Sequence, residues 1–397
     1  MKPLTKTLSI LNESPTLTIT ANAKALKASG ADVVMFSSGE PDFDAPSTIA
    51  QAAKNTIDKG GNGYTAAAGL SELRDAVKSR FNRFNALEYD AADITVSSGA
   101  KQALFNAVRA VCDPGDEVIV IAPYWVSYPE MCKLAGATPI VVRAQKSDGF
   151  VPREAALEAA FNEKTKAIII NTPNNPTGAL YTEETLRMIG RLSERHDVLI
   201  ISDEIYDTLV YDTKHIPMAS LAQYAARTLT INGMSKAYAM TGWRIGFAAG
   251  PRALIQAMNK IQSHTTSNAN TIAQHASIAG LEACDEDVRA MRNTFQKRRD
   301  KAYASLSALE GVEPFFPKGA FYVLCDISAL LGTRYGETRI DSAQAFAEAL
   351  LKAKHVALVP GEAFDAPKSV RVSYATDEQS IDKGLSRLRD FISELSH

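Results

Sequence analysis

The sequence predicts an α/β fold, with a large domain in which helices cover a mostly parallel sheet and a smaller α+β domain. The chain has 397 residues, more than one hydrophobic core usually holds. Between about residues 94 and 231, strand-like runs alternate with helical patterns, which is typical of a parallel sheet covered on both faces. Helical patterns follow Pro251, and shorter mixed elements follow Pro317. We therefore expect a large domain over 45–300 and a small domain made of 1–44 and 301–397.

The elements follow from periodicity and from turn residues. Strands are expected at 94–96, 117–122, 139–142, 166–171, 198–202, 228–231, 320–325, 356–359 and 369–374. Helices are expected at 71–84, 100–111, 128–134, 153–161, 182–196, from 251 to about 309, at 342–354 and from the end of the last strand to 395. Within the long helical region, Arg298 and Arg299 are expected on an exposed face.

Composition favours a protein that acts on small molecules. Hydrophobic residues make up 46% of the chain and charged residues 22%, which is ordinary for a globular protein. The 43 basic and 45 acidic residues form no long run of either sign, which argues against nucleic-acid and membrane-surface partners. The four cysteines are scattered and no histidine spacing suits zinc, so we expect no metal site, no disulfide and a reducing cytoplasm.

Two loops precede the alternating region. Residues 38–43 form a turn by their Gly, Pro and Asp content, and Gly39 is either an ordinary loop glycine or one that presents bare backbone to a ligand. Residues 60–64 form a second loop that ends in Tyr64. Its ring either packs locally or reaches outward to another subunit.

An anion site is expected where the strand at 94–96 turns into a helix. The turn consists of small residues, Ser98, Gly99 and Ala100, and is followed by Lys101. A helix that starts in this way offers free N–H groups and a positive dipole end, which suits a phosphate. Neither a G-x-G-x-x-G fingerprint nor a Walker lysine motif occurs, so a small ligand with one phosphate fits best.

Further polar and aromatic residues follow the strands that end near 122, 171, 202 and 231. The carboxyl ends of parallel strands share one edge of a sheet, and ligands bind there in open α/β folds. Asp203 follows a buried apolar strand and therefore needs a cationic partner. Near the C-terminus, Arg371 in the middle of a strand is either an edge residue in solvent or a buried carboxylate clamp.

The stretch from Asn232 to Gly246 adds a reactive lysine to this edge. Ser235 offers a hydroxyl, Lys236 an amine that is nucleophilic once deprotonated, and Arg244 a planar guanidinium suited to a phosphate or carboxylate. Taken alone, this spacing is also compatible with a surface lysine and an arginine beside the core.

Three motifs together resemble those of the fold-type I, pyridoxal-phosphate-dependent aminotransferases of class I. They are Asn174 to Gly178, Ser202 to Tyr206 and Ser235 to Gly246, and the resemblance covers nearly the whole chain. The turn from Ser98 to Gln102 is most similar to the bacterial and archaeal branch of aspartate aminotransferases, which carries a lysine there. The resemblance implies pyridoxal 5'-phosphate as cofactor, amino-acid and 2-oxo-acid substrates, and a homodimer with shared active sites.

The resemblance also assigns roles around the cofactor. Lys236 would bind the cofactor covalently and shuttle the proton, and Asp203 would pair with the pyridine nitrogen. Asn175 and Tyr206 would hold the phenolic oxygen, and Trp125 would stack on one face of the ring, with Ile205 on the other. The phosphate would be held by Ser98, Gly99, Ala100, Lys101, Ser235 and Arg244, with Tyr64 contributed across the dimer interface.

For the substrate, the resemblance assigns the α-carboxylate to Arg371, helped by Gly39 and Asn175 beside Trp125. It assigns the distal carboxylate to Lys101. The alternative, a solvent lysine at a helix start, is disfavoured because a cation there opposes the helix dipole.

The expected activity is aspartate:2-oxoglutarate aminotransfer, by a ping-pong route through pyridoxamine phosphate. The alternatives are an aminotransferase of the same fold for aromatic amino acids, alanine, kynurenine or prephenate, and a non-catalytic ligand sensor. Glu13-Ser14-Pro15 weakens a prephenate role, because prephenate-accepting members of the branch tend to have a basic residue in this segment.

Overall fold

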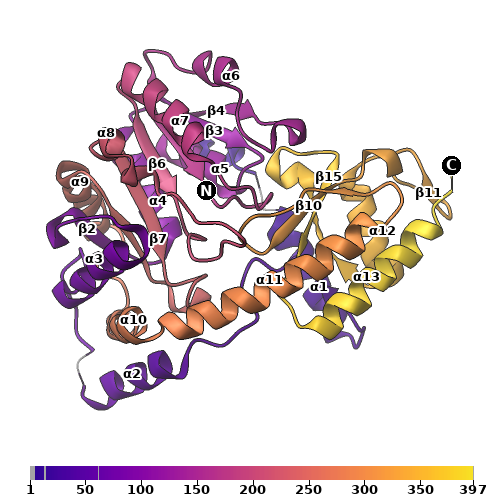
Figure 1. The fold of residues 1–397 in the computed structure, drawn as a ribbon, viewed down its shortest axis with the longest axis horizontal. Coiled ribbons are helices and arrows are strands. Elements are labelled where there is room, and N and C mark those ends of the chain that lie inside the picture. The colour runs from indigo at the N-terminus through magenta and orange to yellow at the C-terminus, as the bar shows by residue number, and fades with distance from the viewer. Residues whose placement is uncertain (1–4, 13–14, 61, 397) are drawn as a thin grey trace.

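A seven-stranded sheet forms the centre of the larger part of the molecule (Figure 1). The structure is a computed structural model and describes residues 5–12, 15–60 and 62–396. One strand, β8, runs antiparallel to both of its neighbours, and the other pairs are parallel, as the sequence predicts. In spatial order the strands are β2 (Ile94–Ser97), β8 (Gly246–Ala249), β7 (Thr228–Gly233), β6 (Leu199–Asp203), β5 (Thr165–Asn171), β3 (Glu117–Ala122) and β4 (Thr138–Arg143).

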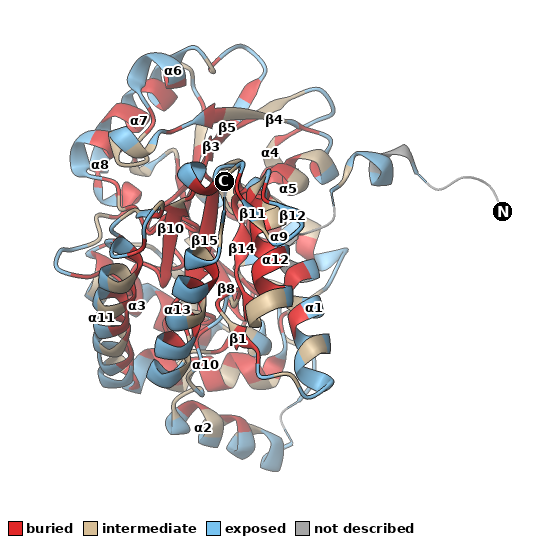
Figure 2. Cartoon of the chain, turned by 90° about the vertical axis from the view of Figure 1, so that its right-hand side faces the viewer, coloured by how far each residue is buried: buried red, intermediate tan, exposed pale blue. Residues whose placement is uncertain are grey.

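Both faces of this sheet are covered by helices, because alternate residues of its strands are apolar on both sides. In β5, Ile169 packs with residues of α4 (Ala100–Val111) and α5 (Ser127–Ala135), whereas Ile168 packs with residues of α7 (Glu183–Arg195). The helices of this part are α2 (Ser47–Asp58), α3 (Ser71–Asn85), α4 (Ala100–Val111), α5 (Ser127–Ala135), α6 (Glu154–Glu158), α7 (Glu183–Arg195), α8 (Ala222–Ala225), α9 (Arg252–Ser263) and α10 (Thr271–Ala283). Figure 2 shows the buried strands inside and the exposed faces of the helices outside.

Strand β8 was not predicted from the sequence. Its four residues include Gly246 and two alanines, which carry little strand signal of their own, and one of its two partners, β2, is distant in the chain. A Cβ added at Gly246 would lie 2.1 Å from the backbone nitrogen of Ala100. The glycine therefore lets β8 pass directly behind the start of α4.

A second, four-stranded antiparallel sheet forms the centre of the smaller part, on the right of Figure 1. Its order is β14 (Val359–Pro360), β15 (Ser369–Ser373), β10 (Tyr322–Asp326) and β9 (Glu313–Pro314). Two short pairs accompany it, β1 (Val34–Met35) with β13 (Val356–Ala357) and β11 (Arg334–Tyr335) with β12 (Thr338–Arg339). The helices α1 (Pro15–Ala28), α12 (Ala343–Lys354) and α13 (Glu378–Ser393) surround it, and the long α11 (Asp285–Ser307) runs from the larger part to the smaller.

The predicted exposure of Arg298 and Arg299 on α11 is wrong, since both are buried, with 7% and 2% of their surface exposed. Arg298 pairs with Asp42 at 2.6 Å, and Arg299 pairs with Asp212 at the same distance. The guanidinium of Arg299 also lies 4.5 Å from the centre of the Phe316 ring. Acidic and aromatic partners far away in the chain compensate the buried charge, and a helix pattern alone does not reveal them.

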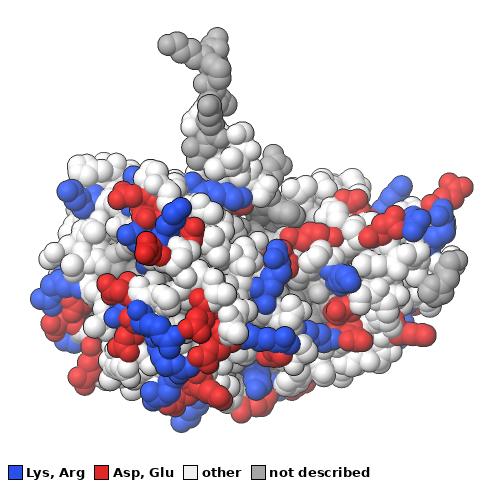
Figure 3. Space-filling view, turned by 90° about the horizontal axis from the view of Figure 1, so that it is seen from above, with Lys and Arg blue, Asp and Glu red and all other residues white. Residues whose placement is uncertain are grey.

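Charged residues of both signs are intermingled on the face shown in Figure 3. None of the described helices is both long and apolar enough to cross a membrane.

Candidate active site

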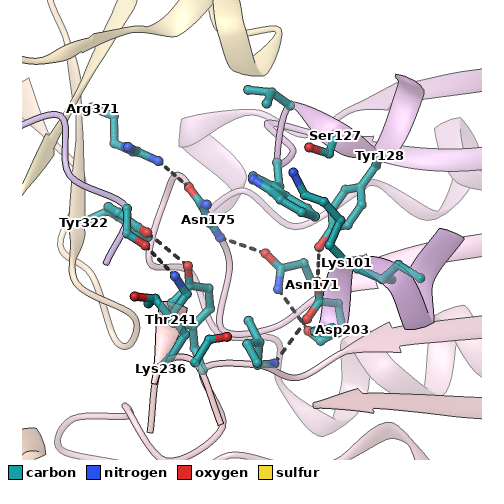
Figure 4. Close-up of a pocket in the computed structure, with 18 of the residues that line it drawn as sticks. Lys101, Ser127, Tyr128, Asn171, Asn175, Asp203, Lys236, Thr241, Tyr322 and Arg371 are labelled. Atoms are coloured by element: carbon teal, nitrogen blue, oxygen red, sulfur yellow. Dashed lines mark hydrogen bonds between the residues drawn. The ribbon is translucent and has the colours of Figure 1, made fainter. Parts of the chain in front are cut away.

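A cavity of about 340 Å³ opens at the carboxyl ends of β3, β5, β6 and β7 and is closed on one side by residues of β10 and β15 (Figure 4). Most of the site residues predicted from the sequence line it: Gly39, Ala100, Lys101, Trp125, Asn175, Asp203, Tyr206, Ser235, Lys236, Arg244 and Arg371. The remaining three, Ser98, Gly99 and Tyr64, are not among its lining residues.

Asp203, at the end of β6, is a buried acid without a cation. One carboxylate oxygen accepts a 2.6 Å hydrogen bond from the hydroxyl of Tyr128, and the other accepts one from the backbone N–H of Ile205. In the described part of the chain no ion pair includes Asp203. Burial raises the pKa of its carboxyl group to about 6. A ligand with a protonated ring nitrogen would supply the missing positive charge.

The two other acids of this turn already have basic partners. Asp207 lies 2.8 Å from the guanidinium of Arg80, and Glu204 lies 2.8 Å from the Nε2 atom of His215. All four side chains are at least 95% buried. Because an isolated buried charge is costly, this contrast singles out Asp203 as the acid that awaits a ligand.

An anion-binding cradle lies where β2 leads into α4. Gly99 precedes the helix with φ of +86°, a conformation that favours glycine, and a Cβ there would lie 2.3 Å from Nη2 of Arg244. The first backbone N–H groups of α4 have no partners within the helix and point toward its open end. Together with Arg244 and the hydroxyl of Ser235, they form a group of donors that fits a phosphate.

Lys236 lies just past the end of β7 and faces the cavity (Figure 4). Its Nζ atom donates a 2.5 Å hydrogen bond to the backbone oxygen of Gly39. The pKa of this amine is lowered to about 8, chiefly by burial; Glu40 opposes the lowering, and Arg371 and Arg244 add to it. A substantial fraction is therefore neutral near pH 7.5, as a nucleophile or a proton acceptor requires.

Arg371, in β15, is a buried cation without an acid. Only 2% of its surface is exposed, and it takes part in no ion pair among the described residues. Its guanidinium donates to the side-chain oxygen of Asn175 at 2.9 Å and to the backbone oxygen of Ser37 at 3.1 Å. It also lies over the ring of Tyr322, 4.3 Å from the ring centre. Of the two interpretations left open by the sequence, the buried clamp is the one this environment favours.

A chain of hydrogen bonds connects Arg371 to Asp203 through two asparagines (Figure 4). The backbone N–H of Asn175 donates to the side chain of Asn171 at 2.8 Å, and Asn171 donates to the backbone oxygen of Asp203 at 2.9 Å. These bonds fix the loop after β5 between the two charged residues.

Lys101 is a further cation of the cavity that has no acid among the described residues. Its Nζ atom lies 4.8 Å from the ring centre of Trp125. Partial burial, with repulsion from Arg244, lowers the pKa of the amine. Four cations thus line the cavity (Lys101, Lys236, Arg244 and Arg371), against one acid, Asp203, so the cavity is suited to ligands with several negative charges.

Sequence reasoning missed several lining residues, including Tyr128, Asn171, Thr241 and Tyr322. Tyr128 lies one helical turn beyond Trp125, and this spacing was a usable signal. Nothing in the sequence connects Tyr322 with Tyr206, and only the meeting of the two sheets reveals their contact.

Tyr64 is 94% exposed, so its ring does not pack against the described part of its own chain. Of the segment Glu13-Ser14-Pro15, the first two residues lie outside the described residues.

Comparison with known proteins identifies the family. A family model described as aminotransferase class I and II matches residues 31–388. The chain belongs to this family. Its cofactor is pyridoxal 5'-phosphate, and the acid without a cation and the phosphate cradle fit the ring nitrogen and the phosphate of that molecule.

This aminotransferase is 45% identical to the aspartate/prephenate aminotransferase of Cereibacter sphaeroides over 397 residues, which is 99% of each chain. It is 42% identical to the aspartate aminotransferase of Bacillus subtilis over 395 residues, covering 99% of this chain and 100% of the relative. Among solved structures, the aspartate aminotransferase from Rhizobium meliloti superimposes with a TM-score of 0.96 at 40% identity, with all of both chains covered. The Thermus thermophilus aspartate aminotransferase with maleate gives 0.93 at 41% identity, with 98% of this chain and 100% of the other covered.

Proposed function

We propose that this aminotransferase transfers the amino group of aspartate to 2-oxoglutarate. One observation carries the choice of a dicarboxylate: Lys101 and Arg371, two cations without acidic partners among the described residues, line the same cavity. An amino acid with two carboxylates would satisfy both. The names of the relatives from Bacillus subtilis and Rhizobium meliloti, both aspartate aminotransferases, support the same substrate.

The cofactor's position follows from the charges of the cavity. When bound, pyridoxal phosphate supplies an aldehyde that receives the amino group and an electron-poor ring that takes up electrons from the substrate. Asp203 would keep the ring nitrogen protonated, and Asn175 and Tyr206 would hold the phenolic oxygen. Trp125 and Ile205 would enclose the ring. The phosphate would lie in the cradle formed by Ser98, Gly99, Ala100, Lys101, Ser235 and Arg244.

The substrate would then be oriented by fixed donors. Arg371 would bind the α-carboxylate, with Asn175 and the backbone of Gly39 beside it. Lys236, with its lowered pKa, would move the proton between Cα of the substrate and C4' of the cofactor, in opposite directions in the two half-reactions. The main effect of Arg371 would be to hold the Cα–H bond over this amine, because proximity contributes much of the rate enhancement.

The decisive experiment uses each half-reaction alone. Adding aspartate without an acceptor to the purified, cofactor-loaded enzyme should convert the absorbance of the lysine-bound cofactor to that of pyridoxamine phosphate, and 2-oxoglutarate should restore it. No spectral change with any amino acid would exclude aminotransfer. A change with alanine or phenylalanine but not with aspartate would refute the dicarboxylate assignment.

Prephenate is a second candidate acceptor, because the relative from Cereibacter sphaeroides is named an aspartate/prephenate aminotransferase. Glu13-Ser14-Pro15 counts against it, as in the sequence-based expectation. The test compares prephenate with 2-oxoglutarate as amino acceptor for the pyridoxamine form of the enzyme, which is first produced with aspartate.

We further propose a homodimer, in which Tyr64, almost fully exposed here, contacts the phosphate of the other subunit. Sedimentation of the wild type gives the assembly state, and Tyr64→Phe should weaken cofactor binding without dissociating the dimer.

The division of the chain into a large domain (45–300) and a small domain (1–44 with 301–397) stays a proposal, supported by the separate hydrophobic clusters around the two sheets. The four buried free cysteines support a reducing compartment such as the cytoplasm.

A further inference from the structure

Tyr322 connects the two halves of the active site. It begins β10 of the four-stranded sheet, and its hydroxyl lies 3.0 Å from the hydroxyl of Tyr206, which follows β6 of the seven-stranded sheet. Both side chains are buried, with 0% and 3% of their surface exposed. The ring of Tyr322 also supports the guanidinium of Arg371, whose central carbon lies 4.3 Å from the ring centre. One side chain therefore contacts the carboxylate clamp with its ring and Tyr206 with its hydroxyl.

The direction of the bond between the two hydroxyls follows from proton counting. A tyrosine hydroxyl has one proton to donate. In the proposed function, Tyr206 donates its proton to the phenolic oxygen of the cofactor, so it can only accept from Tyr322. Tyr322 must then be the donor of the 3.0 Å bond. In such a chain each hydrogen bond polarises the next, and Tyr206 becomes a stronger donor.

One neighbour of Tyr322, Arg371, favours this direction. Both tyrosines keep their protons at neutral pH, because burial raises the pKa of each hydroxyl above its usual value. The positive charge of Arg371 lies over the Tyr322 ring and favours loss of its proton, which improves Tyr322 as a donor. A Cβ added at Gly39 would lie 3.8 Å from the Tyr322 hydroxyl, so the loop that carries Gly39 passes close above this pair.

We propose that Tyr322 is a positioning residue of amino transfer, whose hydroxyl directs the hydrogen bond of Tyr206 and whose ring fixes the plane of the Arg371 guanidinium. The inference rests on the proposed function, because it assigns Tyr206 to the cofactor. Two variants separate the two contacts. Tyr322→Phe removes the hydroxyl and keeps the ring, whereas Tyr322→Leu removes both.

The first measurement is the pH titration of the absorbance of the bound cofactor, which does not depend on turnover. Tyr206 as a donor favours the ionised phenolic oxygen. Loss of the Tyr322 hydroxyl should weaken that donor and raise the titration midpoint by up to about one pH unit. The matched control is Tyr374→Phe. It removes a buried hydroxyl of the same sheet that donates to Ala320 at 3.1 Å, and it should leave the midpoint unchanged.

The second measurement is a double-mutant cycle with Tyr206→Phe. If the hydroxyl of Tyr322 acts through Tyr206, Tyr322→Phe should cause no further shift once Tyr206 has lost its own hydroxyl. Additive shifts would overturn the relay, and so would an unchanged midpoint in the single variant.

The ring contact is tested by kinetics. Tyr322→Phe should keep the KM for aspartate within about twofold, and Tyr322→Leu should raise it about tenfold, because the guanidinium loses its support. Equal KM values in the two variants would overturn this part. A wild-type enzyme that binds no cofactor would refute the proposed function. If the wild type is active and the titration midpoint of Tyr322→Phe equals that of the wild type, only this inference is refuted.

Discussion

Arg371 and Asn175 are joined by a 2.9 Å hydrogen bond although 196 residues separate them in the chain. The bond connects β15 of the smaller sheet to the loop after β5 of the larger one. The two side chains proposed to bind the α-carboxylate are thereby fixed relative to each other before any substrate arrives. Such preorganisation lowers the cost of orienting the substrate on binding.

Arg371→Ala should lower kcat/KM for every amino donor, because the α-carboxylate is common to all of them. Loss of a charge-assisted hydrogen bond costs roughly 1.5 to 3 kcal/mol, which corresponds to about 10- to 150-fold. Steady-state kinetics with aspartate and with phenylalanine provide the measurement, and the ratio of the two efficiencies should stay near its wild-type value. A loss confined to aspartate would contradict the assignment.

Lys101→Ala, in contrast, should act selectively. It should lower kcat/KM for aspartate and glutamate about 10- to 150-fold and leave kcat/KM for phenylalanine nearly unchanged. The substitution keeps the backbone N–H that the phosphate requires, so it isolates the side chain. Lys352→Ala, which removes an exposed lysine on α12, serves as the control. If the efficiency ratio of aspartate to phenylalanine does not move, Lys101 does not set specificity.

Lys236→Ala should retain pyridoxal phosphate through the phosphate cradle and lose its covalent attachment together with nearly all turnover. Borohydride reduction followed by mass spectrometry should find the cofactor mass on the peptide that contains Lys236 in the wild type and nowhere in the variant. Cofactor mass attached to a different peptide would assign the nucleophile to another lysine.

Asp203→Asn should stabilise the cofactor-free protein at neutral and higher pH. Burial raises the pKa of Asp203 to about 6 from its usual 3.8. The stability that the protonated form contributes is therefore complete below pH 4 and is lost as the pH rises through 6. Asparagine resembles the protonated acid, so the variant should gain up to about 3 kcal/mol at pH 8 and about half of that at pH 5.

Urea unfolding of the cofactor-free proteins at these two pH values measures the effect of Asp203→Asn. Asp207→Asn is the contrasting control, since it breaks the pair with Arg80 and should destabilise the protein by about 3 to 5 kcal/mol at both. Adding the cofactor should stabilise the wild type more than Asp203→Asn. An equal gain in both proteins would mean that Asp203 does not pair with the ring nitrogen.

Gly99→Ala should weaken cofactor binding, because the methyl group would displace the Arg244 guanidinium that lies 2.3 Å from the added Cβ. Gly115→Ala is a matched control, since Gly115 has a φ of +99° and no atom within 4 Å of an added Cβ. Both variants should lose about 1 to 2 kcal/mol of stability through backbone strain. Equilibrium titration with pyridoxal phosphate should show weaker binding in Gly99→Ala alone.

Local patterns in the sequence predicted much of the larger sheet and the positions of Lys236, Asp203 and Asn175. Each of these residues lies just past a buried apolar strand, and the ends of parallel strands meet at one edge. The parallel strands around them were predicted from the alternation of strand-like and helical patterns. The family resemblance added what periodicity could not, above all the role proposed for Arg371.

The features that the sequence did not predict depend on contacts between distant segments. Strand β8 is short and forms only because β2 and β7 enclose it. Arg298 and Arg299 are buried because Asp42 and Asp212 meet them from other segments. The contact between Tyr206 and Tyr322 spans 116 residues, and no local propensity encodes it.

The contact between Arg371 and Ser37, 334 residues apart, also has a consequence for how the enzyme is made. Arg244 is the last residue of the proposed phosphate cradle to be synthesised, whereas Arg371, the proposed carboxylate clamp, follows more than a hundred residues later. At about 5 to 20 residues per second, a ribosome needs several seconds to more than twenty to add them. The growing chain therefore contains the residues proposed to hold the phosphate well before it contains the arginine proposed to hold the substrate, so the two parts of the site are completed at different times during biosynthesis.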